Sequence, residues 1–182
     1  HQAFLDTATA LGYPECADAN DPNGYGAGPQ PMNKLGRLRI SAAVGYLAPA
    51  RIRGNLHIRP DTSVRRLLFE GKRCTGAEVQ PSHLPDGDTV SHVSARLVIL
   101  CAGALMSPTI LLRSGVGATG QLAQLGVDTV KDAPGVGQNL SDHPALGVVC
   151  EVRDPSLIDF DRPIIQTILR YTAEGSDKRN DL

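Results

Sequence analysis

The sequence predicts an α/β protein, or α+β if helices and strands are counted strictly, and three observations lead to this class. Residues 64–93 alternate apolar and polar side chains around short turns, which is typical of an antiparallel meander. Residues 96–101 form a continuous apolar run, as a strand buried on both faces does. A helical pattern follows almost at once, over residues 107–113.

The remaining elements are predicted from similar local signals. A helix over residues 2–11 ends at Gly12, and Ser41 begins a second helix that runs to Pro49. Between them, residues 14–37 are rich in Gly, Pro, Asn and Asp, so we expect a long loop there, either a lid or binding loop or a plain surface segment. Further short elements are expected as strands at residues 55–59, 127–130, 146–152 and 164–171, and as a helix at residues 119–125.

Composition excludes some classes of partner. The 182 residues carry a net charge of -1 and 20% charged residues, so the chain lacks the basic field that holds a nucleic acid backbone. No apolar run approaches the ~18 residues of a membrane-spanning helix, and no secretory leader is visible. Four scattered cysteines without metal-ligand spacing indicate reduced thiols, so we expect a cytoplasmic protein. The start at His1 indicates a processed, cut or incomplete N-terminus.

Small residues separate the predicted buried strand from the helix that follows it. Ala102, Gly103 and Ala104 carry little side chain, so a flat or phosphorylated ligand could approach their backbone closely. Ser107 and Pro108 are the predicted N-cap and first residue of the helix, whose free N–H groups favour an anion. A tight packing turn between strand and helix would need the same small residues, so both interpretations stay open at this point.

Three other patterns match functional motifs less well than they match turns. Residues 115–120 have the spacing GxGxxG, but a helix precedes them where a dinucleotide site needs a strand, so we expect a helix end and a turn. Residues 141–143 contain Ser, Asp and His, yet neighbouring side chains point apart and cannot form a charge relay. The Asp and Asn residues at 18–23 lack the order and the closing Glu of a calcium loop.

Residues 103–117 resemble the second signature of the glucose-methanol-choline (GMC) oxidoreductases, with an allowed residue at every fixed position. Residues 39–56 and 64–79 resemble the family's segments around its adenine-contacting strand, and residues 134–144 resemble its loop after the second signature. The resemblance covers about residues 1–150.

The resemblance implies a partial FAD-binding domain of the glutathione-reductase-like type, joined to part of a substrate domain. The implied division is residues 1–50 as a substrate-domain or lid segment, residues 51–145 as part of the FAD-binding domain, and residues 146–182 as the start of the substrate-binding domain. FAD is the implied cofactor and a small-molecule alcohol the implied substrate, oxidised to a carbonyl by hydride transfer to the flavin.

The family pattern also assigns roles to single residues. Val64 matches the position whose backbone contacts the adenine of FAD, Ala102 and Gly103 match positions beside the adenosine, and Asn139 and His143 lie in a loop that resembles one near the cofactor. Ser107 is expected to cap its helix.

The family's phosphate-binding N-terminal motif and its catalytic histidine have no match in this sequence, so we assign no catalytic residue. We expect that the chain alone does not bind FAD tightly and needs the remainder of a parent polypeptide. A non-catalytic binding module of the same fold and a GMC-type hydroxynitrile lyase are the alternatives.

Overall fold

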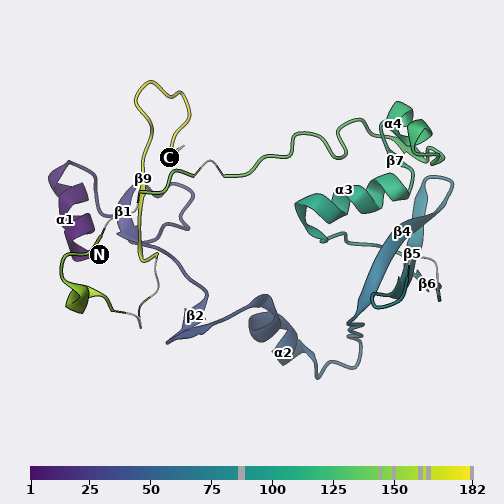
Figure 1. Cartoon of the computed structure of the whole chain (residues 1–182), viewed down its shortest axis with the longest axis horizontal. Coiled ribbons are helices and arrows are strands. Elements are labelled where there is room, and N and C mark those ends of the chain that lie inside the picture. The colour runs from purple at the N-terminus through teal and green to yellow at the C-terminus, as the bar shows by residue number, and fades with distance from the viewer. Residues whose placement is uncertain (86–88, 144, 149–150, 160–161, 163–164, 181–182) are drawn as a thin grey trace. The chain divides into compact units, whose positions relative to one another are not determined.

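The computed structural model describes residues 1–182 except 86–88, 144, 149–150, 160–161, 163–164 and 181–182. The described chain divides into two compact units, one formed by His1–Leu56 with Val148–Leu182 and the other by His57–Gly147. Helices and strands occur in both units, which confirms the predicted mixed class (Figure 1). The functional roles predicted for residues 1–50, 51–145 and 146–182 stay predictions.

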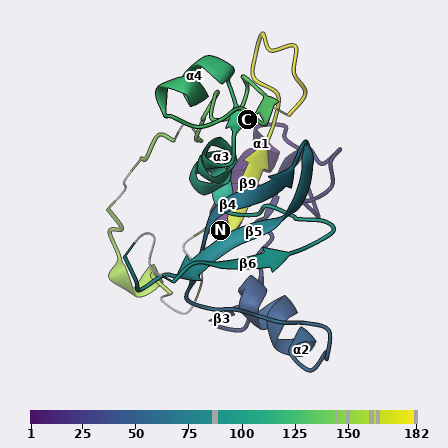
Figure 2. The ribbon, with the colours of Figure 1, turned by 90° about the vertical axis from the view of Figure 1, so that its right-hand side faces the viewer.

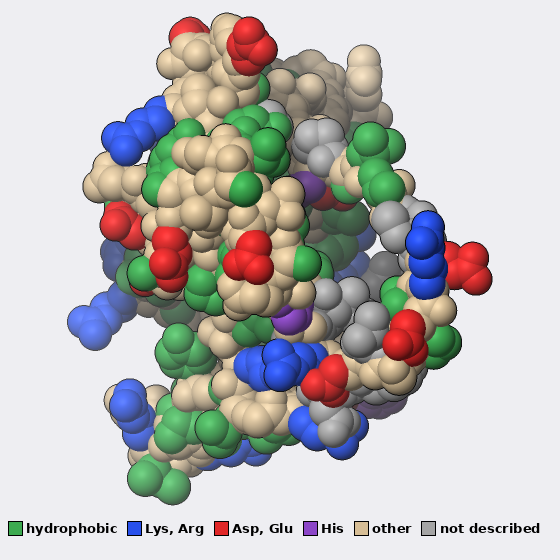
Figure 3. All heavy atoms as spheres, turned by 90° about the vertical axis from the view of Figure 1, so that its left-hand side faces the viewer, with side chains coloured by type: hydrophobic (Ala, Val, Ile, Leu, Met, Phe, Trp, Pro, Cys, Tyr) green, Lys and Arg blue, Asp and Glu red, His purple; other side chains and the backbone are tan. Residues whose placement is uncertain are grey.

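The first unit is held by a sheet that joins its two halves. Strand β1 (Gly26–Pro29) pairs antiparallel with β9 (Thr167–Arg170). Helix α1 (Gln2–Ala10) packs against both strands and buries Ala8. On the α1 side of the molecule, acidic and basic side chains are interspersed (Figure 3). Helix α1 confirms the helix predicted from residue 2, and β9 lies within the strand predicted at residues 164–171. Residue 164 lies outside the described residues.

The predicted long loop at residues 14–37 is more ordered than its composition indicates. It contains β1, and its end forms a hairpin between β2 (Lys34–Leu35) and β3 (Leu38–Arg39). A Cβ atom on Gly28 would lie 1.8 Å from the carbonyl oxygen of Cys16, so only glycine allows this close backbone approach. The Gly-rich composition therefore serves a close packing of two chain segments as well as turns.

The segment after the hairpin is helical, as predicted, but irregular. A π-helical turn, η1 (Ala43–Leu47), runs directly into α2 (Ala48–Ala50), and the Ser41 hydroxyl accepts a hydrogen bond from the Val44 N–H at 3.4 Å. The strand predicted at residues 55–59 is wrong, since the chain there turns and then extends without a partner strand.

The second unit contains the predicted meander. Strand β4 (Thr62–Glu70) pairs with β5 (Arg73–Pro81), which pairs with β6 (Ser91–Ser94), all antiparallel (Figure 2). The register shifts between Val64 and Arg66, so one strand bulges beside β5. Because β4 is an edge strand, one of its sides remains available to other elements.

A helix covers part of that edge. Helix α3 (Gly103–Arg113) packs against β4, and the Ser114 hydroxyl at its C-terminal end accepts a hydrogen bond from the Leu67 N–H at 2.7 Å. The buried apolar side chains of the unit come from β4, β5, α3 and α4: Leu67, Val79, Ile110 and Leu122.

Two short strands follow the helix. Strand β7 (Val116–Gly117) pairs in parallel with β8 (Lys131–Asp132), and α4 (Thr119–Gln124) connects them. The strand predicted at residues 127–130 is wrong, since none of these residues is in a strand and β8 begins only after them. A β-ladder depends on its partner, and β7 is the partner that fixes this position.

The predicted buried strand at residues 96–101 is wrong for this chain. The segment is extended but pairs with no described strand, and Leu97 and Ile99 are 77% and 79% exposed. A strand buried on both faces needs neighbours on both edges and layers on both faces. The described part of the chain supplies none of these.

Near its end the chain has little regular structure apart from β9. The strand predicted at residues 146–152 is not formed in the described residues of that range, and a 3₁₀ turn, η2 (Pro155–Leu157), follows. Cys16, Cys74 and Cys101 are free thiols, while Cys150 lies outside the described residues. None of the described helices is long and apolar enough to cross a membrane.

Candidate functional site

All five residues predicted to bind the cofactor belong to the unit His57–Gly147. Val64 is half-buried on β4, opposite Val79 on β5. Ala102 and Gly103 lie at the start of α3, and the remaining two lie in the loop after β8. The structure thus brings the predicted helix start and the predicted strand into one unit, through the packing of α3 on β4.

The start of α3 differs from the sequence prediction. The helix begins at Gly103, with Ala102 as its N-cap, so Pro108 lies inside the helix rather than at its first position. The Ser107 hydroxyl does not cap later N–H groups but accepts a hydrogen bond from the Ala102 N–H at 3.1 Å. The helix therefore already begins at the small residues 102–104. Pro108 is tolerated inside it because proline removes only one helical hydrogen bond, the one that an N–H at position 108 would donate to the Ala104 carbonyl.

Gly103 keeps this helix start open. Its φ angle is +83°, in the left-handed region that favours glycine, and a Cβ atom there would meet no heavy atom within 4 Å. The glycine is therefore required for the backbone conformation and not for packing inside this chain. The space in front of it is free for a ligand.

A hollow of about 450 Å³ runs between α3 and the loop after β8. Its lining residues from the helix are Ala104, Leu105, Pro108, Thr109 and Leu112, and those from the loop are Gly137, Gln138, Asn139, Leu140 and Ser141. None of these side chains titrates near neutral pH, so the hollow can hold and orient a ligand but offers no acid or base of its own.

The loop keeps a defined shape at the edge of this hollow. Gly137 and Asn139 have φ angles of +77° and +56°, and Asn is the non-glycine residue that tolerates this region best, with Asp. Leu140 is 67% exposed, so it presents apolar surface at the rim. The structure places the predicted residue Asn139 beside the helix that Gly103 begins.

Among the described residues, the polar partner of His143 is its neighbour Asp142. Its side chain is fully exposed, and its Nδ1 atom lies 3.9 Å from Oδ1 of Asp142, which accepts the His143 backbone N–H at 2.7 Å. Within the described residues no hydrogen bond joins Ser141 to His143, which agrees with the interpretation that residues 141–143 are not a charge relay. The predicted position of His143 near a cofactor stays a prediction.

Only the first glycine of the GxGxxG pattern takes the helix-end role expected for it. Gly115 ends α3 with a φ angle of +81°, and a Cβ atom there would lie 2.3 Å from the carbonyl oxygen of Asp128. Gly117 belongs to β7 and Gly120 to α4. At residues 18–23, the Asp18 and Asp21 carboxylates accept backbone N–H groups two residues later, the turn chemistry predicted for them. No cluster of His, Cys, Asp and Glu suited to a metal occurs among the described residues.

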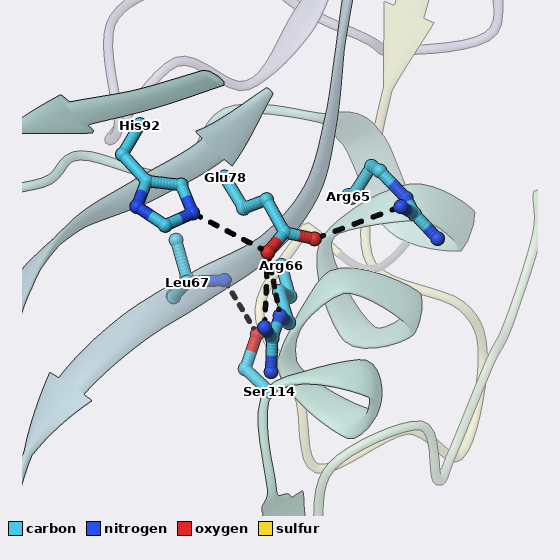
Figure 4. Close-up of polar contacts among 6 residues, drawn as sticks. All are labelled: Arg65, Arg66, Leu67, Glu78, His92 and Ser114. Carbon is cyan, nitrogen blue, oxygen red and sulfur yellow. Dashed lines mark hydrogen bonds and ion pairs between the residues drawn. The ribbon is translucent and has the colours of Figure 1, made fainter. Parts of the chain in front are cut away.

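A cluster of charged side chains that no sequence pattern predicted surrounds Glu78 on β5 (Figure 4). Glu78 is only 7% exposed, and its carboxylate accepts two hydrogen bonds from Arg66, at 3.2 Å from Nε and 2.9 Å from Nη2. The Nη1 atom of Arg65 lies 3.8 Å from Oε1, and Nε2 of His92 lies 3.6 Å from Oε2.

These neighbours lower the pKa of Glu78, chiefly through the hydrogen bonds from Arg66, while burial acts in the opposite direction. The same pair raises the pKa of Arg66. A sequence signal existed, since Arg66 and Glu78 fall on strands joined by a turn. The bulge between Val64 and Arg66 sets which arginine faces the carboxylate, and no local pattern predicts that bulge.

Comparison with known proteins gives one family. The model of the family described as GMC oxidoreductase matches residues 1–145. A GMC-type oxidoreductase of Rhodococcus erythropolis is 39% identical over 96% of this chain and 36% of its own length. An oxygen-dependent choline dehydrogenase of Burkholderia cenocepacia is 38% identical over 85% of this chain and 27% of its own length.

Solved structures agree with this result. An FAD-dependent oxidoreductase from Chaetomium thermophilum superposes with a TM-score of 0.69 and 33% identity, over 78% of this chain and 24% of that one. The chain therefore spans about a quarter to a third of the length of the proteins it matches.

Proposed function

Because this chain belongs to the GMC oxidoreductase family, we propose that it forms the adenosine side of a flavin site in an FAD-dependent enzyme that oxidises an alcohol. The observation that carries this proposal is the start of α3. There a positive-φ glycine with open space in front of it follows Ala102, and the first N–H groups of an eleven-residue helix are exposed. Such a helix start favours a negatively charged or electron-rich ligand edge.

The residues of the chain divide the work of holding FAD. Ala102 and Gly103 would let the adenosine approach the backbone, and Val64 would contact the adenine from the edge strand β4. Asn139 and His143 would approach the cofactor from the loop after β8. Bound flavin would supply the acceptor for the hydride of the alcohol.

The substrate class rests on the relatives. One of them is a choline dehydrogenase, and choline carries a primary hydroxyl group. Since the family's catalytic histidine has no match in this sequence, the base that takes the hydroxyl proton would come from the rest of a GMC enzyme.

The exposed segment 96–101 supports a need for further polypeptide. Leu97 and Ile99 present most of their surface to water, and the backbone of the segment pairs with no described strand. Exposed apolar side chains on an unpaired extended segment are unfavourable in an isolated protein. We propose that neighbouring strands from the rest of a GMC enzyme cover this segment and complete the flavin site.

A chimera tests the proposal. This chain would replace the matching region of the Rhodococcus erythropolis relative, with which it is 39% identical. We expect the chimera to purify with bound flavin and to oxidise an alcohol, and the 182-residue chain alone to lose flavin in gel filtration. Flavin that stays with the isolated chain would contradict the need for further polypeptide.

A matched pair of glycine variants locates the site. Gly103 and Gly126 both have positive φ angles, +83° and +68°, and neither would bring a Cβ atom within 4 Å of another heavy atom. Gly103→Val and Gly126→Val therefore impose a similar backbone strain, but only the first lies at the proposed site. We expect Gly103→Val alone to lower the flavin content of the chimera, about tenfold or more. Equal retention of flavin by both variants would place the adenosine elsewhere.

A further inference from the structure

A second hollow, of about 600 Å³, lies at the C-terminal end of α3, opposite the helix start at Gly103. Its lining residues are Arg65, Arg66, Glu78, Val90, Arg113 and Val127. Since a helix of 11 residues is about 16 Å long, this hollow and the helix start at Gly103 are separate places. Three of the six lining residues are arginines, so positive charge is concentrated in this hollow.

The charges in this hollow do not balance. Glu78 neutralises Arg66, with which it makes a close pair at 2.9 Å. Arg65 reaches the same carboxylate only at 3.8 Å, beyond hydrogen-bond distance. Within the described residues, the side chain of Arg113 makes no hydrogen bond or ion pair. Two guanidinium groups thus remain without a close carboxylate, and the hollow carries an excess of about two positive charges.

The local backbone does not cancel this excess. Arg113 stands in the last turn of α3, where the partial negative charge of the helix end favours a cation. That partial charge is about half a unit, which is less than the excess in the hollow. His92 also faces Glu78, at 3.6 Å, and adds positive charge when it is protonated.

From these charges we infer that the hollow binds the phosphate group of a small phosphorylated molecule. A phosphate monoester carries nearly two negative charges at neutral pH, which matches the two incompletely paired arginines. Guanidinium groups offer paired N–H donors that fit phosphate oxygens. Val90 and Val127 provide an apolar wall for the rest of the molecule, and a volume of about 600 Å³ lies in the usual range for such ligands.

Calorimetric titration of the full 182-residue chain tests the inference, with phenyl phosphate and inorganic phosphate as probes at constant ionic strength. We expect saturable binding of one phenyl phosphate per chain and weaker binding of inorganic phosphate, which has no group to place against the valines. Arg113→Gln should weaken phenyl phosphate binding about tenfold, since it removes a charged hydrogen-bond donor. Arg113→Lys should recover part of this loss, because it keeps the charge without the paired donors.

Arg59→Gln is the matched control, because Arg59 is exposed in the same unit but does not line the hollow. We expect it to leave binding unchanged. Equal losses in Arg59→Gln and Arg113→Gln would show diffuse attraction by surface charge and overturn the inference. So would binding that Arg113→Gln leaves intact, or heat signals that sodium chloride reproduces at the same ionic strength. Circular dichroism of each variant excludes a loss caused by unfolding.

Discussion

The meander β4–β5–β6 and the segment 96–101 have similarly strand-like sequences, yet only the meander forms strands. Both are rich in β-branched and apolar residues. The paired residues of the meander lie close together in the sequence, as Thr62 with Pro81 and Gly76 with Ser94, so its hydrogen bonds close locally. The segment 96–101 has no partner in the described chain. The difference shows that sequence pattern fixes the tendency to extend, whereas pairing depends on which neighbours are present.

Hydrogen exchange should reveal the largest difference between the two regions. The amides of residues 76–79 bond to neighbouring strands, while those of residues 97–100 have no described strand partner. We expect exchange at residues 97–100 to be about 10³-fold faster or more, measured by NMR or mass spectrometry. Comparable protection in both regions would mean that segment 96–101 finds a partner in solution, which would break the comparison.

Truncation of one leucine in each region sharpens the comparison in energy. Leu67→Ala removes a side chain that is 9% exposed, and we expect it to lower the free energy of unfolding by about 3 kcal/mol. Leu97→Ala removes one that is 77% exposed and should change it by less than about 0.5 kcal/mol. Urea denaturation followed by circular dichroism measures both. A large effect of Leu97→Ala would show that the segment is packed.

The attachment of α3 to the meander is expected to have an intermediate effect. Ser114→Ala leaves the buried Leu67 N–H without its acceptor, which should cost about 2 kcal/mol. Thr109→Ala is the matched control, since its hydroxyl donates to the Leu105 carbonyl on an exposed face of the same helix. Thr109→Ala should lower the free energy of unfolding by much less than Ser114→Ala in the same denaturation experiment. Similar losses in the two variants would mean that the Ser114 bond adds nothing specific.

The smallest expected effect is the pH dependence that Glu78 gives the meander. Its folded-state pKa lies below the usual value of 4.5, so its contribution is present above that value and is lost as pH falls through the lower folded-state pKa. Glu78→Gln should cost about 1 kcal/mol at pH 7, because its main partner Arg66 is half exposed.

The test is the difference in unfolding free energy between the original chain and Glu78→Gln, measured from pH 7 down to pH 3. We expect the difference to shrink below pH 4.5. A difference that stays constant over this range would exclude an ionised Glu78 as its source.

The elements that depend on neighbouring residues in the sequence could be predicted from it. The meander, the glycine ends of α3 and α4, and the helix at residues 2–10 follow from alternation, turns and left-handed glycines. The start of α3 was predicted too late, because Ser107 and Pro108 look like a helix start although residues 102–104 already begin it. Ser followed by Pro is common at helix starts, but that preference is only statistical. In this chain the Ser107 hydroxyl instead accepts a hydrogen bond from the Ala102 N–H, which the preference does not predict.

Features that join distant residues were not predictable. The pairing of β1 with β9 unites segments about 140 residues apart, and nothing near Gly26 in the sequence indicates Arg170 as its partner. The convergence of two arginines and a histidine on Glu78 depends on strand register and on one bulge. All five residues predicted to bind the cofactor lie in one unit, but their contact with FAD stays a prediction.

The pairing of β1 with β9 has a consequence for how the chain can be divided. Tyr13 and Tyr171 make an edge-on ring contact beside this sheet, and Asn180 donates to the carbonyl of Gly24, so the two ends of the sequence close on each other. Residues 57–147 are therefore an uninterrupted insertion that could be excised and still keep its internal ladders. Neither residues 1–56 nor residues 148–182 could be excised in that way, because cutting out one would strip the other of its sheet partner.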